Sequence, residues 1–303
     1  MGLRFIFDYP VINRAEIDML DAGPIDEVAA CAENNGFYGF ALTDHPVPGV
    51  RWLNAGGHQA LDPFVALGYA AGATNNLRLL THLAVAPYRN PFILAKAAAT
   101  VDKLSGGRMI LGLGTGYHKT EFFALGVDWD QRNALFDEVL EVLPLHWSGE
   151  PFSYHGINFD ARDVIGLPRP VQNPIPIWIG GNSKLSRIRI AEKAQGWMPL
   201  LGSAELHRTT RTPQIGSLED LSRQIAEIRD AAANAGRDDH IDLLYSYEDQ
   251  SLAGDPSTDA ERHREAFADL ERAGVNYVNV SSMTFAATET LSFIEAFGST
   301  YLR

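Results

Sequence analysis

The chain has 303 residues, a formal net charge of −13 and a hydrophobic content of 46%. This is enough apolar material for a large core, yet no apolar run approaches the roughly 18 residues that a membrane-spanning helix needs. The acidic excess argues against nucleic acid and anionic lipid as partners, because both bind basic surfaces. Cys31 is the only cysteine, which excludes an internal disulfide and a multi-cysteine metal site, so we expect a reduced, cytoplasmic compartment.

The chain alternates between short apolar runs typical of strands and amphipathic stretches typical of helices. In chain order, the predicted strands cover residues 4–8, 37–43, 77–86, 108–113, 175–179, 196–200, 241–245 and 275–280. The helices after them are predicted to begin near Pro24, Asp62, Asn90, Asp130, Ser183, Ser217, Thr258 and Thr288. Thr258 opens a predicted capping box with Glu261, and Pro144 is expected to kink or end the fourth helix.

Eight strands alternating with eight helices predict a (β/α)8 barrel, or TIM barrel, formed by residues 1–303 as a single domain. The strands are nearly continuous apolar runs, as expected for parallel strands that are buried on both faces. Residues 148–174 break the rhythm, and we expect them to form an irregular insertion between the fourth helix and the fifth strand. The alternative architecture is a doubly wound open sheet, which the strand count disfavours.

In such a barrel the functional residues follow the carboxyl ends of the strands. Asp44 and His45 follow the second strand, and a carboxylate beside an imidazole can orient a substrate or move a proton. The alternative is a simple turn, in which Asp44 caps backbone amides and His45 is exposed. His82, in the third strand, is either a satisfied core residue or a side chain that points into the open end of the barrel.

The fourth strand runs into Gly114, Thr115, Gly116 and Tyr117. Two glycines at this spacing let the backbone approach a flat ligand closely or adopt a positive φ. The segment lacks the third glycine of a dinucleotide-binding fingerprint, and the alternative interpretation is a tight turn between strand and helix. His118 and Glu121 follow as His-x-x-Glu, but no second histidine cluster accompanies them, so no metal site is predicted.

The fifth strand is followed by Gly180, Gly181, Asn182 and Ser183, which lead directly into a helix. Free amides and the positive end of the helix dipole make this segment a candidate phosphate site. The cations of the next two turns would strengthen it, namely Lys184, Arg187 and Arg189. The alternative is an ordinary capped helix whose cations are solvated.

These motifs occur in an order that is similar to a known superfamily. The relevant segments are Thr43-Asp44-His45, Thr81-His82-Leu83, the Leu-Ser-Gly-Gly-Arg run at 104–108 with the Gly-x-Gly-x-Gly-Tyr that follows it, and Pro-Ile-Pro-Ile-Trp-Ile-Gly-Gly at 174–181. Together they resemble the bacterial luciferase-like monooxygenase superfamily over nearly the whole chain. Within it, the sequence looks most like the deazaflavin-dependent branch, which uses coenzyme F420, rather than the FMN-using branch.

The resemblance implies a deazaflavin or flavin ring at the carboxyl ends of the strands. It implies a cis peptide between His82 and Leu83 behind the ring, and it assigns ring or phosphate contacts to Asp44, His82, Leu83, Gly114, Thr115, Gly116, Gly180, Gly181, Asn182 and Ser183. It also implies that His45 touches both ring and substrate, and that the helix at 63–71 contributes to a homodimer. Tyr117 stands where the sugar-phosphate dehydrogenases of the family have a glutamate, which puts sugar-phosphate oxidation in doubt.

We therefore expect an oxidoreductase that transfers a hydride between F420 and a small organic substrate, either an alcohol or carbonyl or an activated double bond. His45 and Tyr117 are the predicted catalytic residues. The first alternative is an FMN-dependent monooxygenase, and the second is a non-catalytic barrel that binds a flavin. The resemblance leaves the identity of the substrate open.

Overall fold

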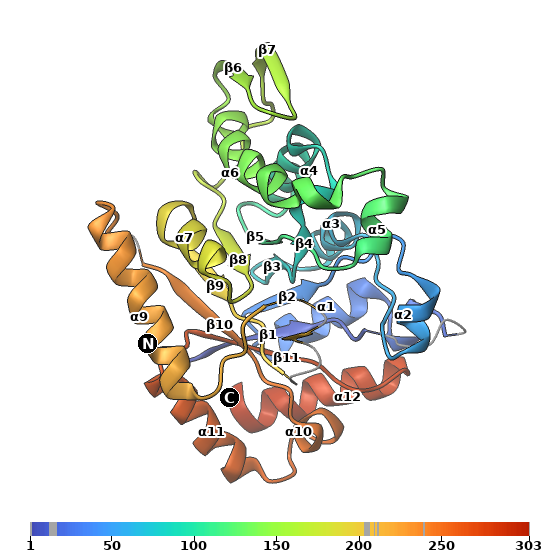
Figure 1. The fold of residues 1–303 in the computed structure, drawn as a ribbon. Coiled ribbons are helices and arrows are strands. Elements are labelled where there is room, and N and C mark those ends of the chain that lie inside the picture. Colours follow the sequence, from blue (N-terminus) through green and yellow to red (C-terminus); the bar gives the residue numbers. More distant parts are fainter. Residues whose placement is uncertain are drawn as a thin grey trace.

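The computed structural model describes residues 2–11, 17–202, 207–208, 210, 212–238 and 240–302. Its central feature is a closed barrel of parallel strands (Figure 1). The strands are β1 (Arg4–Asp8), β2 (Gly39–Leu42), β3 (Arg78–Thr81) with its continuation β4 (Ala84–Val85), β5 (Met109–Gly114), β8 (Ile177–Gly180), β9 (Gly196–Met198), β10 (Asp242–Ser246) and β11 (Tyr277–Val280). The barrel closes where β11 pairs with β1 and where β3 pairs with β5, so the predicted (β/α)8 architecture is confirmed.

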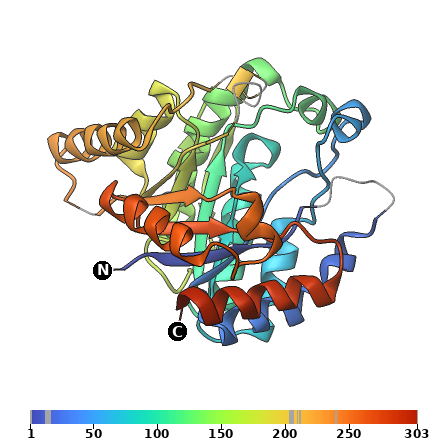
Figure 2. The same ribbon diagram turned by 90° about the horizontal axis from the view of Figure 1, so that it is seen from below.

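Helices surround the barrel, and α12 lies beside α1 where the chain closes on itself (Figure 2). The longer helices are α1 (Ile25–Asn34), α3 (Pro63–Ala73), α4 (Pro91–Leu104), α6 (Arg132–Ser148), α7 (Lys184–Lys193), α9 (Leu218–Asn234), α11 (Ala260–Arg272) and α12 (Ala287–Phe297). Three short helices occupy loops that follow strands, namely α2 (Val50–Asn54), α5 (Lys119–Ala124) and α10 (Gln250–Gly254). These short helices were not predicted from the sequence, and two of them carry residues of the candidate site.

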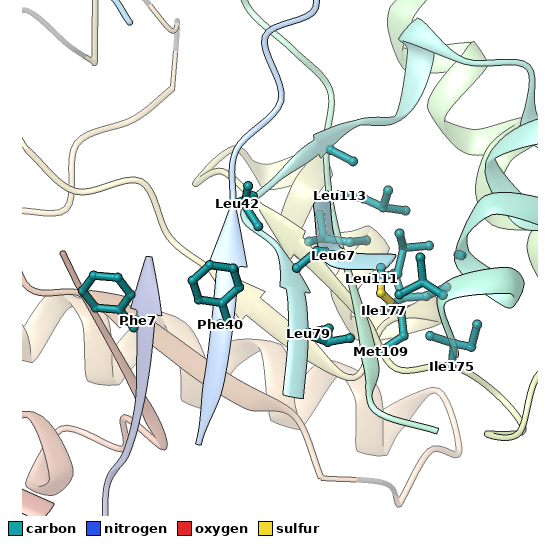
Figure 3. Packing of buried hydrophobic residues seen from close by; sticks show 14 of the residues in the cluster. Phe7, Phe40, Leu42, Leu67, Leu79, Met109, Leu111, Leu113, Ile175 and Ile177 are labelled. Atoms are coloured by element: carbon teal, nitrogen blue, oxygen red, sulfur yellow. The ribbon is translucent and has the colours of Figure 1, made fainter. Parts of the chain in front are cut away.

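The core has two layers because neighbouring residues of a strand point to opposite faces. Phe7 and Phe40 pack outside the barrel against the helices (Figure 3). The barrel interior is filled by Ile6, Ala41, Leu80, Ile110, Trp178, Met198, Leu244 and Tyr277. A side chain two residues beyond an interior residue faces the same axis, nearer to the carboxyl ends of the strands. This end of the barrel is called the barrel mouth below.

The predicted insertion is more regular than expected. Its two strands, β6 (Pro151–His155) and β7 (Asp160–Ile165), form an antiparallel hairpin that projects from the body of the protein beyond α6 (Figure 1). In β7 only Ala161 is buried, so this strand lacks the alternation that makes a strand recognisable in sequence, whereas β6 alternates over only five residues. The expectation of an irregular segment is therefore wrong for residues 151–165.

Two helix boundaries differ from the sequence signals. Pro144 does not end helix α6, which continues to Ser148, with Leu143 and Trp147 buried on either side of the proline and Trp147 Nε1 donating to the Ala95 carbonyl. Helix α11 begins after Asp259, whose φ is +51° and whose side chain makes no capping bond. The predicted capping box fails because Thr258 bonds back to Asp255 instead.

Candidate active site

His45 lies at the barrel mouth, directly beyond β2, and is only 7% exposed. Its Nδ1 is 3.1 Å from Oε2 of Glu121, a residue of α5 that is completely buried. The Glu121 carboxylate also accepts from the Tyr88 hydroxyl at 2.9 Å and from the Val47 amide at 3.2 Å. The alternative in which His45 is an exposed turn residue is therefore wrong.

These hydrogen bonds decide the charge of Glu121. Burial by itself would raise the pKa of the Glu121 carboxyl, but the bonds from His45, Tyr88 and Val47 outweigh burial and the pKa is lowered. A carboxylate only accepts hydrogen bonds, so it binds the Nδ1–H of His45. This assignment leaves Nε2 as the ring nitrogen that is free to exchange a proton with a ligand.

Aromatic rings enclose His45. The centroid of its ring lies 4.6 Å from that of Trp52, which belongs to α2, and 4.8 Å from that of His58. Burial and the neighbouring His45 lower the pKa of His58 to about 4, so His58 is neutral at neutral pH. His118 Nε2 accepts from the Gly49 amide at 2.9 Å and ties α2 to the segment that precedes α5.

Tyr117 is half-buried, with its ring centroid 6.1 Å from that of His45. Burial and the nearby Glu121 raise the pKa of its phenol to about 12, so the hydroxyl keeps its proton at neutral pH. Unlike Tyr88, its hydroxyl makes no hydrogen bond to the part of the chain that the structure describes. Tyr117 can therefore donate to a ligand.

Asp44 is engaged within the protein. It is 2% exposed, its Oδ2 accepts from the Val85 amide at 2.9 Å, and Arg89 forms an ion pair with it. Asp44 therefore bonds a backbone amide of β4 rather than an amide of its own turn. Its carboxylate joins the loop after β2 to β4 and to Arg89 beyond it.

His82 turns toward the barrel mouth. It lies two residues beyond the interior residue Leu80, its peptide bond to Leu83 is cis as expected, and its side chain is 17% exposed. Its Nδ1 is 2.9 Å from Oδ2 of Asp8, at the end of β1. Sequence reasoning missed Asp8 and gave Glu121 no role except as a weak metal-like pair with His118. For Asp8, its position at the end of a strand was the available signal.

Leu83 fits a gap that two glycines leave open. A Cβ placed on Gly114 or on Gly180 would collide with the Leu83 side chain, which therefore lies between the ends of β5 and β8. Gly116 has a φ of +79°, and a Cβ there would meet Val85 at 2.6 Å. The glycines thus admit Leu83 and a left-handed turn, and Leu83 offers an apolar surface on which a flat ring can rest.

The loop after β8 has fewer free donors than the sequence suggested. The Asn182 amide donates to Thr212 Oγ1 at 2.9 Å, and the Asn182 carboxamide bonds the carbonyls of Leu200 and Pro213. Ser183 caps α7 by accepting from the Ser186 amide. Gly181 has a φ of +96°, which favours glycine at this turn.

The expected cluster of cations after this loop is only partly present. Arg189 is buried and bonded to Asp137 of α6, 2.7 Å away, so it faces away from the loop. Arg187 is bonded to the Asn182 carbonyl and to Gln224. Lys184 is exposed, and its amide lies in the first turn of α7, where a helix has no internal partner for it.

The sequence model of the luciferase-like monooxygenase family matches residues 14–290. The chain belongs to this family. An uncharacterised protein of Mycobacterium tuberculosis (strain ATCC 25618 / H37Rv) is 30% identical over 228 residues, covering 69% of this chain and 74% of that protein. An FMNH(2)-dependent dimethylsulfone monooxygenase of Pseudomonas putida is 29% identical over 69% of this chain and 53% of its own length. An F420-dependent glucose-6-phosphate dehydrogenase of Microbacterium testaceum (strain StLB037) is 29% identical over 61% of this chain and 53% of its own length.

Solved structures share the fold of this luciferase-like chain. An F420-dependent secondary alcohol dehydrogenase, in complex with an F420-acetone adduct, matches with a TM-score of 0.77 and 18% identity, covering 100% of this chain and 99% of the other. Monooxygenase RslO1 from Streptomyces bottropensis matches with a TM-score of 0.74 and 23% identity, covering 99% of each chain. The family thus includes both F420-dependent enzymes and monooxygenases on one barrel.

Two further findings apply to the described part of this luciferase-like chain. Its titratable side chains include no group of three or more that could hold a metal ion. None of its helices is long and apolar enough to cross a membrane.

Proposed function

We propose that this luciferase-like protein is an oxidoreductase that transfers a hydride between F420 and a small organic substrate, with His45 moving the accompanying proton. The observation that carries the proposal is the bond between His45 and the buried Glu121 carboxylate. A deazaflavin supplies hydride chemistry at a ring carbon when it is bound. Loss or gain of a hydride at a substrate carbon that bears oxygen requires a proton transfer at that oxygen, and a histidine whose Nδ1 is held can perform it at Nε2.

The other predicted residues take roles that agree with their contacts. The Leu83 side chain supports the ring, and the Tyr117 hydroxyl donates to the ring or to the substrate. The coenzyme phosphate lies at Gly181 and Ser183, where the first turn of α7 and the exposed Lys184 supply donors and positive charge. Asp44 and Asn182 shape these loops through their internal bonds.

The choice of F420 draws on the relatives as well as on the site. The F420-dependent glucose-6-phosphate dehydrogenase is similar in sequence, and the F420-dependent secondary alcohol dehydrogenase is similar over the whole fold. A neutral tyrosine at position 117 replaces the acidic proton donor expected of a sugar-phosphate dehydrogenase. We therefore propose a simple alcohol or carbonyl compound as the substrate class.

A side-by-side titration of the purified protein with F420 and with FMN, followed by absorbance and fluorescence, tests the cofactor. We expect saturable binding of F420 and no comparable binding of FMN. Binding of FMN without binding of F420 contradicts the proposal. His45→Ala is the matched variant, and it should still bind F420 because the phosphate loop is unchanged.

The second candidate is an FMN-dependent monooxygenase, which the similarity to the dimethylsulfone enzyme favours. Reduced FMN activates dioxygen, whereas a deazaflavin reacts poorly with it because a carbon replaces a ring nitrogen. Oxygen consumption with reduced FMN and substrate distinguishes this activity from hydride transfer. A barrel that binds a flavin without catalysis is the remaining alternative, and it predicts that His45→Ala changes no measurable turnover.

We also propose that the protein forms a homodimer in the cytoplasm through the exposed face of α3. Val65 and Tyr69 are one helical turn apart on this face, and their side chains are 74% and 60% exposed. Gly68 and Gly72 have open space where a side chain would stand, which allows the close approach of a second helix. Large exposed apolar side chains beside small residues are typical of a surface that another subunit covers.

A further inference from the structure

A second histidine with a carboxylate partner lies at the barrel mouth. His82 Nδ1 is 2.9 Å from Asp8 Oδ2, and the same oxygen accepts from Asn279 Nδ2 at 2.9 Å. Asp8, His82 and Asn279 are each two residues beyond an interior residue of the barrel, namely Ile6, Leu80 and Tyr277. The three side chains therefore form a polar end to the apolar interior, on three different segments of the chain. They are called the Asp8 cluster below.

Two oxygens of the Asp8 cluster have no hydrogen-bond donor. Asp8 Oδ1 and Asn279 Oδ1 are both buried and unpartnered within the described residues, and Asn279 is only 5% exposed. Buried polar atoms in folded proteins are nearly always paired, so two unpaired acceptors in one cluster indicate that something else supplies donors. Asn279 Nδ2 also lies 3.1 Å from His82 Nδ1, so the three side chains form one connected network.

The surroundings of the Asp8 cluster add negative charge. Glu248 follows β10 by two residues, on the inward-facing side of that strand. The Glu248 side chain is exposed, but the surrounding protein desolvates its carboxyl and raises the pKa of that group. The Asp8 charge also raises this pKa, whereas His82 lowers it. Among the described residues, neither Lys nor Arg contributes to this shift. Among the described residues, the site thus offers acceptors and carboxylates without a contribution from lysine or arginine.

We propose that the Asp8 cluster with Glu248 selects the substrate and favours one that carries hydrogen-bond donors, above all an amine, over one that carries a carboxylate or phosphate. This inference rests on the proposed function only in placing the substrate at the barrel mouth. A protonated amine satisfies unpaired acceptors and gains attraction from Asp8 and Glu248, whereas an anionic group meets repulsion and no donor. The preferred substrate is therefore an amino alcohol or a polyhydroxylated alcohol, or the corresponding carbonyl compound.

Three probes that share one secondary alcohol test the inference: 1-amino-2-propanol, 2-propanol and 2-hydroxypropanoate. They differ in a single substituent, which is cationic, neutral or anionic. Binding to the full chain is followed by the side-chain NMR signal of His82, assigned by its loss in His82→Gln. We expect the amine to bind about tenfold more tightly than 2-propanol, which corresponds to one favourable charge contact, and the carboxylate to bind most weakly.

Two variants remove the charges one at a time. Glu248→Gln alters an exposed side chain, and Asp8→Asn keeps the shape of a buried one, so at least the first preserves the fold. Each should bring the affinities for the amine and the carboxylate closer together. Glu227→Gln removes one charge from the outer face of α9 and is the matched control, for which we expect the wild-type ratio of the two affinities.

The inference is overturned if the carboxylate binds as tightly as the amine, if the amine does not bind, or if both variants keep the wild-type ratio of the two affinities. These measurements need no coenzyme, so their outcome is separate from the titration with F420 and FMN. Failure of F420 binding with the expected probe order would contradict the proposed function alone. F420 binding with a reversed probe order would contradict the selectivity alone.

Discussion

The Nδ1 of His45 lies 3.1 Å from the Oε2 of Glu121, and these two residues come from loops that follow different strands. Glu121 is completely buried, so its carboxylate has no alternative partner in solvent. Removing one member of a buried, hydrogen-bonded pair leaves the other unsatisfied, and such losses are much larger than those of surface pairs. This relationship makes Glu121 a positioning residue for His45.

Glu121→Gln should lower kcat by about 10²-fold while KM changes little, because proton transfer at His45 depends on the tautomer that Glu121 selects. The amide of glutamine can present either a donor or an acceptor to Nδ1, so His45 is no longer held in one form. The NMR signature of the His45 ring distinguishes this effect from general damage, since a purely structural role would leave the tautomer unchanged. A wild-type tautomer with reduced kcat would contradict the assignment.

Glu121→Gln should also change how the free energy of unfolding depends on pH. The pKa of Glu121 is lower in the folded protein than its ordinary value of 4.5, so the folded state binds this proton less readily than the unfolded state. Glu121 therefore stabilises the fold above pH 4.5, and this contribution is lost as the pH falls through the lower folded-state pKa. Urea unfolding at pH 7 and below pH 4.5 should show a smaller pH dependence in Glu121→Gln than in the wild type. An equal dependence in both proteins would show that Glu121 titrates normally.

His58 affects the free energy of unfolding in a different pH range from Glu121. Its pKa is lowered from 6.5 to about 4, so between these values the unfolded state binds more protons than the folded state. Linkage then requires the free energy of unfolding to rise as the pH increases from about 4 to about 6.5. His58→Asn should flatten this rise, whereas substitution of the exposed His155 should leave it intact. Chemical denaturation at several pH values provides the measurement.

Two substitutions of Gly181 distinguish the effect of backbone strain from the effect of an added negative charge. Gly181→Ala should cost about 1 kcal/mol of stability, because an L residue at a φ of +96° is disfavoured. Gly181→Asp adds a carboxylate beside the proposed phosphate position, so it should weaken F420 binding strongly beyond the effect of the alanine variant. Equal dissociation constants for the two variants would place the phosphate elsewhere.

The exposed face of α3 predicts the oligomeric state. Tyr69→Glu should convert the homodimer to a monomer in size-exclusion chromatography with light scattering, because a charge at the centre of an apolar interface is not compensated. Ile157→Glu is the control, since Ile157 is 82% exposed on the separate hairpin of β6 and β7. A monomeric wild-type protein, or a dimer that persists in Tyr69→Glu, would contradict this interface.

Much of the barrel could be predicted because its strands follow local rules. Each of the eight predicted strands overlaps an observed one, since a parallel strand buried on both faces appears as an apolar run. Helix starts with strong local chemistry were also found, such as Asp62, which caps α3 through the amides of Phe64 and Val65. The capping box at Thr258 failed because Asp255 offered Thr258 a competing partner, which short-range spacing does not reveal.

The sequence by itself determined the closed barrel, the family, and which loops follow the strands at the barrel mouth. It named His45 and His82 as candidates but left open an exposed turn for His45 and a core position for His82. Only the tertiary structure decided between these, by placing Glu121 against His45 and Asp8 against His82. Those pairings join residues 76 and 74 positions apart, so they depend on how the barrel closes rather than on any local pattern.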